Sequence, residues 1–516
     1  MCSVAACRAA LLTMNRDDRV VPGRLGHAGR NSRNGGDITM ANVSNTDEKS
    51  EFGTLPRRGA DLWDIKGYVE RPARDVPVID DVDVVVAGGG ITGIIAAIAS
   101  GRLGARTLVV EPFGCLGGNM GPGMFAGGSL HLALKNPEAF PDGLGGIPGQ
   151  FNERVVAHER RLVGSNYLRD SKTVPYVATR MLEEAGVRML LYTAVVDVIR
   201  DGRTLQGIFV ENKSGALAIR ARCVIDCTGT ADIADRAGAP VIELDQDPSM
   251  GVYFGLQGID VERWDREVLN RPPLSDEDEQ WVAAHAPSGA KFMPWARQAW
   301  EAGEFRIAQV VDGFATLEIS AKDPKGDPSI ANCRTRVNGR FHPGDGIALS
   351  RIAQQQWCFI YEFVSFLNKY VPGAEHACLT VVSPYFQARG GKSIESEYTL
   401  TVDDVVGGAR FDDVVYTYYD DKRFIEGGCD VPLRMLIPKG VDGLLASGRS
   451  AMKRGPQFRQ RYSAQQMGQV AGTVAALAAR QGVSPRDVDV RAVQRTLIEA
   501  GAHVAPESRL KELGIV

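Results

Sequence analysis

The sequence has few cysteines for its length, and none of them lies in the spacing of a redox or metal-binding motif. Nine cysteines are scattered over 516 residues, and no two form a Cys-x-x-Cys pair. An odd number argues against the disulfide framework of a secreted protein. Cys115 has no second cysteine at redox spacing, so a disulfide reductase is not expected, and no metal site is predicted.

A strong excess of charge and a long hydrophobic run are also missing. The formal net charge is −4, which is too small to recruit nucleic acid or an anionic membrane through a global field. The apolar run from Ala9 to Met14 is short and follows Arg8, so it predicts neither a signal peptide nor a membrane span. The expected location is therefore the cytoplasm.

Glycine, in contrast, is abundant. The chain has 58 glycines, about 11% of its residues against a usual share of about 7%. Such an excess is typical of chains with many tight turns and close backbone approaches to a ligand. The glycines between residues 88 and 93 are the most informative.

A strand, a glycine-rich turn, a helix and a second strand are predicted between residues 82 and 111. The turn satisfies G-x-G-x-x-G, and Glu111 ends the second strand. In such a unit Gly88 permits the tight turn, Gly90 lets the backbone approach a pyrophosphate, and Gly93 allows close helix–strand packing. Glu111 would accept hydrogen bonds from an adenosine ribose, and its negative charge disfavours NADP.

Three later segments favour FAD over NAD as the dinucleotide. Gly117-Gly118-Asn119 follows the ribose carboxylate, a strand near residue 225 ends in Thr228-Gly229, and a strand near residue 445 ends in Gly448-Arg449. A chain that merely binds NAD does not need these additional returns to the cofactor. We therefore predict bound FAD, and we expect Gly90→Val to give a colourless, poorly folded protein.

These motifs together resemble those of a known family. The runs 81–118, 225–229 and 432–476 are similar to the FAD-dependent oxidoreductase family of the glutathione-reductase-like flavoprotein superfamily, and more distantly to fumarate-reductase-type flavoproteins. The resemblance extends from Trp63 to near Arg480. It implies an α/β fold in which a Rossmann-like FAD-binding domain carries an inserted α+β substrate domain.

Five segments follow from this organisation. They are a disordered N-terminal segment (1–62), with Met14 and Met40 as alternative starts, the first part of the FAD-binding domain (63–244), the inserted substrate or cap domain (245–420), the second part of the FAD-binding domain (421–482) and a C-terminal helical tail (483–516).

The resemblance also implies which residues hold FAD. Val195 would present its backbone to the adenine, Arg449 would lie near the flavin half, and a helix beginning near Met467 would aim its N–H groups at the flavin. The complete predicted set is Gly88, Gly90, Ile91, Thr92, Gly93, Glu111, Gly117, Gly118, Asn119, Val195, Thr228, Gly229, Gly448, Arg449 and Gly468.

The catalytic candidates are Arg389, Lys392 and His131. The family usually has two arginines three apart, and this chain keeps Arg389 but has Lys392 at the second position, which puts a strict carboxylate clamp in doubt because lysine lacks the planar fork. A structural salt bridge to Glu397 or Asp403 is the alternative for both residues. His131 could serve as an acid or base, although a lone histidine is more often structural.

The predicted function is FAD-dependent oxidation, as a dehydrogenase or oxidase, with hydride transfer from a small organic substrate to flavin N5. A reductase of an activated double bond fed by a partner, and a flavin-binding subunit of a larger complex, are the alternatives. The electron acceptor (oxygen, a quinone or a carrier protein) and homo-oligomerisation are left open. A hydroxylase is disfavoured because Gly448-Arg449 stands where Gly-Asp is usual, and an RNA-modifying enzyme is disfavoured by the acidic balance. Residues 143–149 are interpreted as a loop, so no second dinucleotide-binding domain is expected.

Overall fold

The computed structural model describes residues 69–70, 72–123, 144–158, 161, 173–244, 251–285, 287–305, 331–335, 344, 346–387, 391–419, 428–452 and 460–516. The chain divides into two units, Met1–Arg71 and Pro72–Val516, and the fold below is that of the second unit. The segment predicted to be disordered, 1–62, lies outside the described residues. Within the described part, no helix is both long and apolar enough to cross a bilayer.

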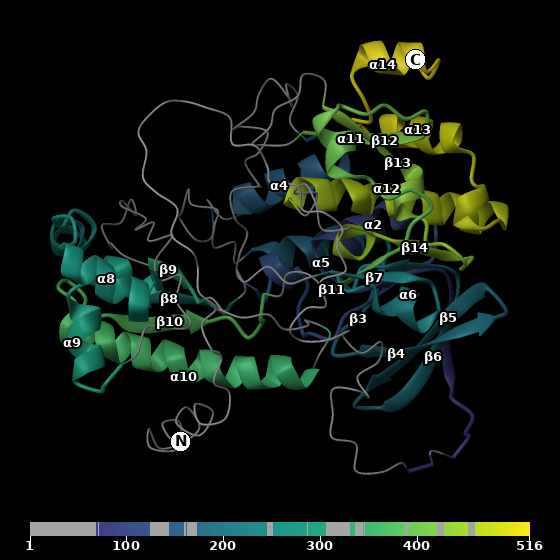
Figure 1. The fold of residues 1–516 in the computed structure, drawn as a ribbon. Helices are drawn as coiled ribbons and strands as arrows, with labels where there is room; N and C mark the ends of the chain where they lie inside the picture. Colours follow the sequence, from purple (N-terminus) through teal and green to yellow (C-terminus); the bar gives the residue numbers. More distant parts are fainter. Residues whose placement is uncertain are drawn as a thin grey trace, which may run out of the picture. The chain divides into compact units, whose positions relative to one another are not determined.

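The main element of the second unit is a seven-stranded sheet (Figure 1). It is built from β1 (Val78–Ala87), β2 (Thr107–Val110), β3 (Arg188–Leu190), β4 (Ala194–Asp201), β5 (Thr204–Asn212), β6 (Gly215–Asp226) and β14 (Leu444–Ala446). The order is β3-β2-β1-β6-β5-β4, and β14 pairs with the last residues of β6. β3, β2, β1, β6 and β14 are parallel, whereas β5 and β4 are antiparallel. The predicted α/β, Rossmann-like fold class is confirmed.

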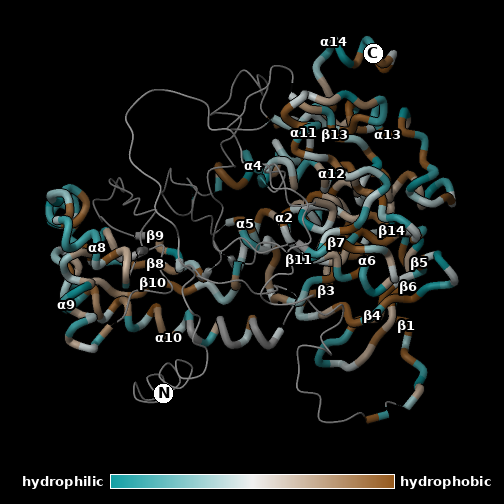
Figure 2. The backbone as a smooth tube through the Cα atoms, viewed as in Figure 1, coloured by the Kyte–Doolittle hydropathy of each residue, from teal (hydrophilic) through white to brown (hydrophobic). Residues whose placement is uncertain are grey.

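The valines of β1 explain why this strand lies inside the sheet. Val84, Val85 and Val86 are fully buried, as expected of a parallel strand that is covered on both faces. Val84 pairs with Thr107 on one side and with Cys223 on the other. Buried hydrophobic residues also make up most of α2 (Ile91–Arg102), and Figure 2 colours the chain by hydropathy. The predicted strand–turn–helix–strand unit is therefore present.

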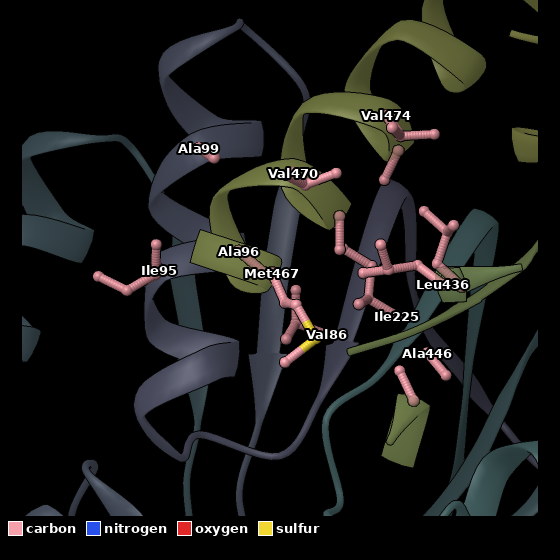
Figure 3. Close-up of a cluster of buried hydrophobic side chains, with 14 of the residues drawn as sticks. Val86, Ile95, Ala96, Ala99, Ile225, Leu436, Ala446, Met467, Val470 and Val474 are labelled. Atoms are coloured by element: carbon pink, nitrogen blue, oxygen red, sulfur yellow. The ribbon is translucent and has the colours of Figure 1, made fainter. Parts of the chain in front are cut away.

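Two glycines let α12 (Arg461–Gln481) lie directly on α2. A Cβ on Gly468 would be 2.4 Å from the Thr92 carbonyl oxygen, and one on Gly472 would be 2.0 Å from that of Ala96. Glycine is therefore required for the two backbones to approach this closely. Figure 3 shows Met467, Val470 and Val474 of α12 in the buried cluster that includes Val86 of β1 and Ile225 of β6.

The first hydrophobic core region contains further helices, and two of them are the last helices of the chain. They are α4 (Gly146–His158), α5 (Val174–Glu184), α6 (Asp232–Arg236), α13 (Val490–Glu499) and α14 (Glu507–Glu512). The interpretation of residues 143–149 as a loop is wrong from Gly146 onward, because α4 begins there; Gly143 lies outside the described residues. Pro148 is tolerated in the first turn, where an N–H has no helical partner, and the Ile147 N–H instead donates to Gln469 Oε1 (3.0 Å).

A second hydrophobic core occupies part of the region predicted to be inserted. Its elements are β8 (Tyr253–Gln257), α7 (Val261–Trp264), α8 (Asp276–His285), α9 (Trp295–Glu301), β9 (Ala331–Arg334), α10 (Gly346–Tyr370) and β10 (Cys378–Val382). The three strands form an antiparallel sheet in the order β10-β8-β9, and α10 runs alongside it (Figure 1). Phe254, Phe292 and Phe363 are buried in this core. It is an α+β arrangement with a core of its own.

Residues 391–419 and 428–432 pack on the first core. It contains β11 (Gly391–Ile394), which pairs with β7 (Val241–Leu244), then α11 (Val402–Val406), and then β12 (Val414–Tyr418), which pairs with β13 (Cys429–Pro432). Ile394, Val405 and Val414 belong to the first hydrophobic cluster. The segment limits given above stay a prediction.

An ion pair between β1 and the residue that precedes β2 gives folding a dependence on pH. Arg106 donates to the Asp83 carboxylate from its backbone N (2.9 Å), Nε (3.2 Å) and Nη2 (3.1 Å), and these bonds hold the pKa of Asp83 below its ordinary 3.8. Because the pKa is lower in the folded state, the stabilisation is present above the unfolded value and is lost as the pH falls through the folded one. We expect Asp83→Asn to lower the free energy of unfolding by about 0.5–1 kcal/mol at neutral pH, and this loss to shrink progressively as the pH falls below 3.8. Urea unfolding at several pH values measures this, with exposed Asp81→Asn as the control; an equal loss at all pH values would contradict it.

Candidate functional site

The two predicted glycine segments lie next to each other at the carboxyl end of β1. Gly90 forms a parallel bridge with Gly117, and the Gly117 N–H donates to the Gly89 carbonyl (2.8 Å). A Cβ on Gly118 would be 3.2 Å from the Gly90 Cα. Gly88, Gly117 and Gly118 have φ values of 106°, 112° and 50°, a region that favours glycine. These segments therefore form one cradle of bare backbone.

Glu111 is buried beside this cradle and is anchored by backbone N–H groups. Its Oε2 accepts from Gly89 N (2.7 Å) and its Oε1 accepts from Phe113 N (3.0 Å). Burial raises the pKa of Glu111 above its ordinary value, while these two donors lower it. Each carboxylate oxygen can accept a further hydrogen bond, so the side chain can still bind a ribose hydroxyl.

The two later segments, Thr228-Gly229 and Gly448-Arg449, also lie against this cradle. A Cβ on Gly448 would be 2.6 Å from Thr92 Oγ1, and one on Gly229 would be 2.9 Å from Arg449 Nη2. A Cβ on Gly88 would be 2.6 Å from the carbonyl oxygen of Cys227, which immediately precedes Thr228. The structure thus brings together four segments that lie up to about 360 residues apart in the sequence, at the strand ends where dinucleotides bind.

A buried carboxylate that the sequence analysis missed organises two of these segments. Asp226 is fully buried at the end of β6, and its Oδ1 accepts from Thr228 N (3.1 Å), Thr228 Oγ1 (2.8 Å) and Ser450 Oγ (3.0 Å). Its Oδ2 accepts from Ile233 N (3.0 Å) and Ala234 N (3.1 Å) at the start of α6. Ser450 Oγ in turn accepts from Gly229 N (3.0 Å). An acidic residue at the end of an apolar strand was the signal available in the sequence.

The model of the FAD dependent oxidoreductase family matches residues 83–497, a span that contains every one of these segments. The chain belongs to the FAD-dependent oxidoreductase family.

Several solved structures resemble this chain at low sequence identity. A geranylgeranyl bacteriochlorophyll reductase-like protein from Thermoplasma acidophilum has 14% identity and a TM-score of 0.40, with 82% of this chain and 87% of that chain covered. The p-nitrophenol 4-monooxygenase PnpA from Pseudomonas putida DLL-E4 has 11% identity and a TM-score of 0.37, with 85% and 93% covered. A mutant of the halogenase PltM in complex with FAD has 10% identity and a TM-score of 0.38, with 81% and 73% covered.

The residues of the cradle fit FAD, the cofactor of the family. A Cβ on Gly90 would meet nothing within 4 Å, so the backbone there faces open space. Gly90 is also the N-cap of α2 and supplies no capping side chain, which leaves the first-turn N–H groups for a phosphate. The buried Oδ1 of Asn119 has no hydrogen-bond partner within the described part of the chain. Buried polar atoms are normally paired, so an unpaired oxygen beside the cradle suits a ligand donor.

Val195 and Gly468 also have roles in packing, and their predicted contacts with FAD stay predictions. Val195 is on β4, where it pairs with Val210 and packs against the first core. Gly468 contacts the Thr92 carbonyl, so the close crossing of α12 and α2 requires it. The predicted helix start near Met467 is wrong: α12 begins at Arg461, because Gln460 is its N-cap and the Ala464 N–H already donates to the Gln460 carbonyl. Met467 thus lies in the second turn.

The structure locates one of the three catalytic candidates. His131 and Arg389 lie outside the described residues. Lys392 Nζ is 2.7 Å from Asp235 Oδ2 on α6, and both side chains are largely buried. The expected partners of Lys392, Glu397 or Asp403, are therefore wrong. Glu397 pairs with Arg486 instead. Because β11 lies beside β7, Lys392 reaches the helix that follows β6, a neighbour 157 positions away in the sequence.

Proposed function

We propose that this protein is a dehydrogenase or oxidase that transfers a hydride from a small organic substrate to N5 of its FAD. Bound FAD supplies the redox chemistry, and the chain supplies binding, orientation and a proton route. The substrate is proposed to bind against the region with the second core.

The contact between that region and the cofactor cradle carries the proposal. Ser383 Oγ donates to the Pro122 carbonyl (2.7 Å), and Gln387 Nε2 donates to the Gly123 carbonyl (2.7 Å). Ser383 and Gln387 follow β10 of the second core, whereas Pro122 and Gly123 come just after Gly117-Gly118-Asn119. A substrate held by the second core would therefore lie close to the cofactor segment.

Tyr385, which lies between Ser383 and Gln387, adds an aromatic ring and a hydroxyl group to this contact. The ring of Tyr385 packs against that of Phe113, with centroids 5.3 Å apart, and Phe113 follows Glu111. Burial raises the pKa of Tyr385, while the nearby Arg449 lowers it. The phenol therefore stays protonated at neutral pH and can donate a hydrogen bond.

An anaerobic titration of the purified holoprotein tests the direction of electron flow. Amines, amino acids, alcohols and hydroxy acids would be added one at a time while the visible flavin band is followed. Bleaching by one class of donor supports the proposal. A flavin that no donor bleaches, but that an activated alkene reoxidises after chemical reduction, would contradict it and favour the reductase.

Arg389→Ala is expected to keep FAD but lose substrate oxidation. We propose that Arg389 binds an anionic group of the substrate, and loss of a charge-assisted hydrogen bond of about 1.5–3 kcal/mol would lower kcat/KM about 10- to 100-fold. The anaerobic bleaching rate and the visible spectrum measure the two effects separately. Arg389→Lys keeps the charge and should lose less. An unchanged kcat/KM would remove Arg389 from the site.

We propose Lys392 and His131 as further catalytic residues. Their variants would be tested by the same two measurements, the anaerobic bleaching rate and the visible spectrum. Lys392→Met removes the partner of Asp235, so a variant with lowered stability and normal turnover would make Lys392 purely structural. The electron acceptor is proposed to be oxygen, a quinone or a carrier protein. Reoxidation of the bleached flavin by air, by a soluble quinone, or by neither separates these three.

A further inference from the structure

Tyr192 has an unusual backbone and an unusual environment. It lies between β3 and β4 with φ at 53°, and the only other non-glycine residue with positive φ in the described part of the chain is Ala231. The left-handed region is unfavourable for a bulky side chain, because its Cβ crowds the following carbonyl. The Tyr192 side chain is 72% exposed, so burial within this chain does not compensate for the strain. Strain at an exposed aromatic residue suggests a ligand.

The surrounding backbone holds Tyr192 in place. The Glu111 N–H donates to the Leu190 carbonyl (3.0 Å), the Thr193 N–H donates to the Glu111 carbonyl (3.1 Å), and the Tyr192 N–H donates to the Phe113 carbonyl (3.2 Å). These bonds connect the segment 190–193 to the segment 111–113. The ring is therefore presented by two strand ends that are bonded to each other.

A missing side chain makes room for the ring. A Cβ on Gly114 would be 2.0 Å from Tyr192 Oη and 2.1 Å from its Cζ, so the phenol end lies directly on the Gly114 backbone. Tyr192 as a whole nevertheless stays 72% exposed. The arrangement thus offers an aromatic surface beside Glu111.

The position of Glu111 indicates which part of the cofactor meets this surface. Glu111 Oε2 is bonded to Gly89 N of the glycine turn, which fits the pyrophosphate, so the phosphate end of a ribose held by Glu111 lies on the β1 side. The base, at the opposite end of that ribose, then lies on the β3 side, and Val110 of β2 pairs with Leu190 of β3. Tyr192 follows Leu190 by two residues.

We propose that Tyr192 is a binding residue for the adenine of FAD and that its ring stacks on the base. Stacking between an aromatic side chain and a base contributes to binding irrespective of hydrogen bonding, and it would offset the strain of the backbone only when FAD is bound. This role is independent of the substrate and of the direction of electron flow.

The test compares Tyr192→Asn with Tyr192→Phe in the full-length chain stripped of FAD. Asparagine tolerates the left-handed backbone but has no ring, whereas phenylalanine keeps the ring. We expect Tyr192→Asn to weaken FAD binding by about 10- to 100-fold and Tyr192→Phe to change it by less than about threefold. ADP, used as a competitor of FAD, carries the adenosine without the flavin, and its affinity should fall by the same factor in Tyr192→Asn.

Two results would overturn the proposal. One is an unchanged affinity of Tyr192→Asn for FAD, and the other is a loss for FAD without a loss for ADP. Thermal unfolding of the two stripped variants checks that both are folded. Relief of the strained backbone should leave Tyr192→Asn at least as stable as the wild type. Because the readout is binding, failure here would leave the proposed oxidation untouched.

Discussion

The Gly90→Val variant should fold normally and bind FAD about 100-fold more weakly than the wild type, because the added methyl groups occupy the space that the pyrophosphate needs. The Gly90 backbone has φ −68° and ψ 176°, a conformation that any residue adopts, and a Cβ there meets nothing within 4 Å. The expectation of poor folding stated from the sequence is therefore corrected, while the expectation of a colourless protein remains. FAD titration of the stripped protein and its circular-dichroism melting curve measure binding and folding separately.

Gly93→Val is the matched control, because Gly93 lies three residues further on, in the first turn of α2. A Cβ on Gly93 would be 1.9 Å from the Gly88 carbonyl oxygen, so the strand and the helix would have to separate. This variant should fail to fold, with or without FAD. If Gly90→Val also failed to fold, or if it kept full affinity for FAD, our description of the cradle would be wrong.

Asp226→Ala should lower the free energy of unfolding by at least about 3 kcal/mol, because it leaves several buried donors without an acceptor. The carboxylate accepts from Thr228, Ser450, Ile233 and Ala234, and these bonds fix the ends of the segments that carry Gly229 and Arg449. FAD affinity should fall as well. Urea unfolding of the variant and of the wild type measures the loss.

Asp232→Asn provides the control for this prediction. Asp232 is half-buried six residues further on and accepts from Thr230 Oγ1 (2.9 Å), so its substitution should cost less than about 1 kcal/mol. Asp226→Asn keeps one acceptor oxygen but turns an amide toward the Ile233 and Ala234 N–H groups, and it should fall between the two. Equal midpoints for Asp226→Ala and the wild type would show that the network does not stabilise the fold.

Local sequence patterns predicted the elements that depend on neighbouring residues. The valine run of β1, the glycine turn and α2 follow from strand and helix periodicity together with the backbone needs of G-x-G-x-x-G. Glu111 could be placed for the same reason, since it ends the strand next in sequence. The convergence of Gly117, Thr228 and Gly448 on that turn came from the family resemblance rather than from any local pattern.

Features that depend on distant residues could not be predicted. Lys392 pairs with Asp235 because β11 lies beside β7, and no spacing in the sequence indicates that pairing. The first turn of α4 has the composition of a loop and is helical because Gln469, more than 300 positions away, accepts its N–H. The strained turn at Tyr192 lacks the glycine or asparagine that usually marks a left-handed residue.

The most direct test of the central claim is the FAD content of the purified full-length protein and of Gly90→Val, measured from the visible flavin band and from the released cofactor. The structure predicts about one FAD per chain in the wild type, and a folded but nearly colourless Gly90→Val. A folded wild-type protein that takes up no FAD, or a Gly90→Val variant that carries as much FAD as the wild type, would contradict the assignment of the cradle as the cofactor site.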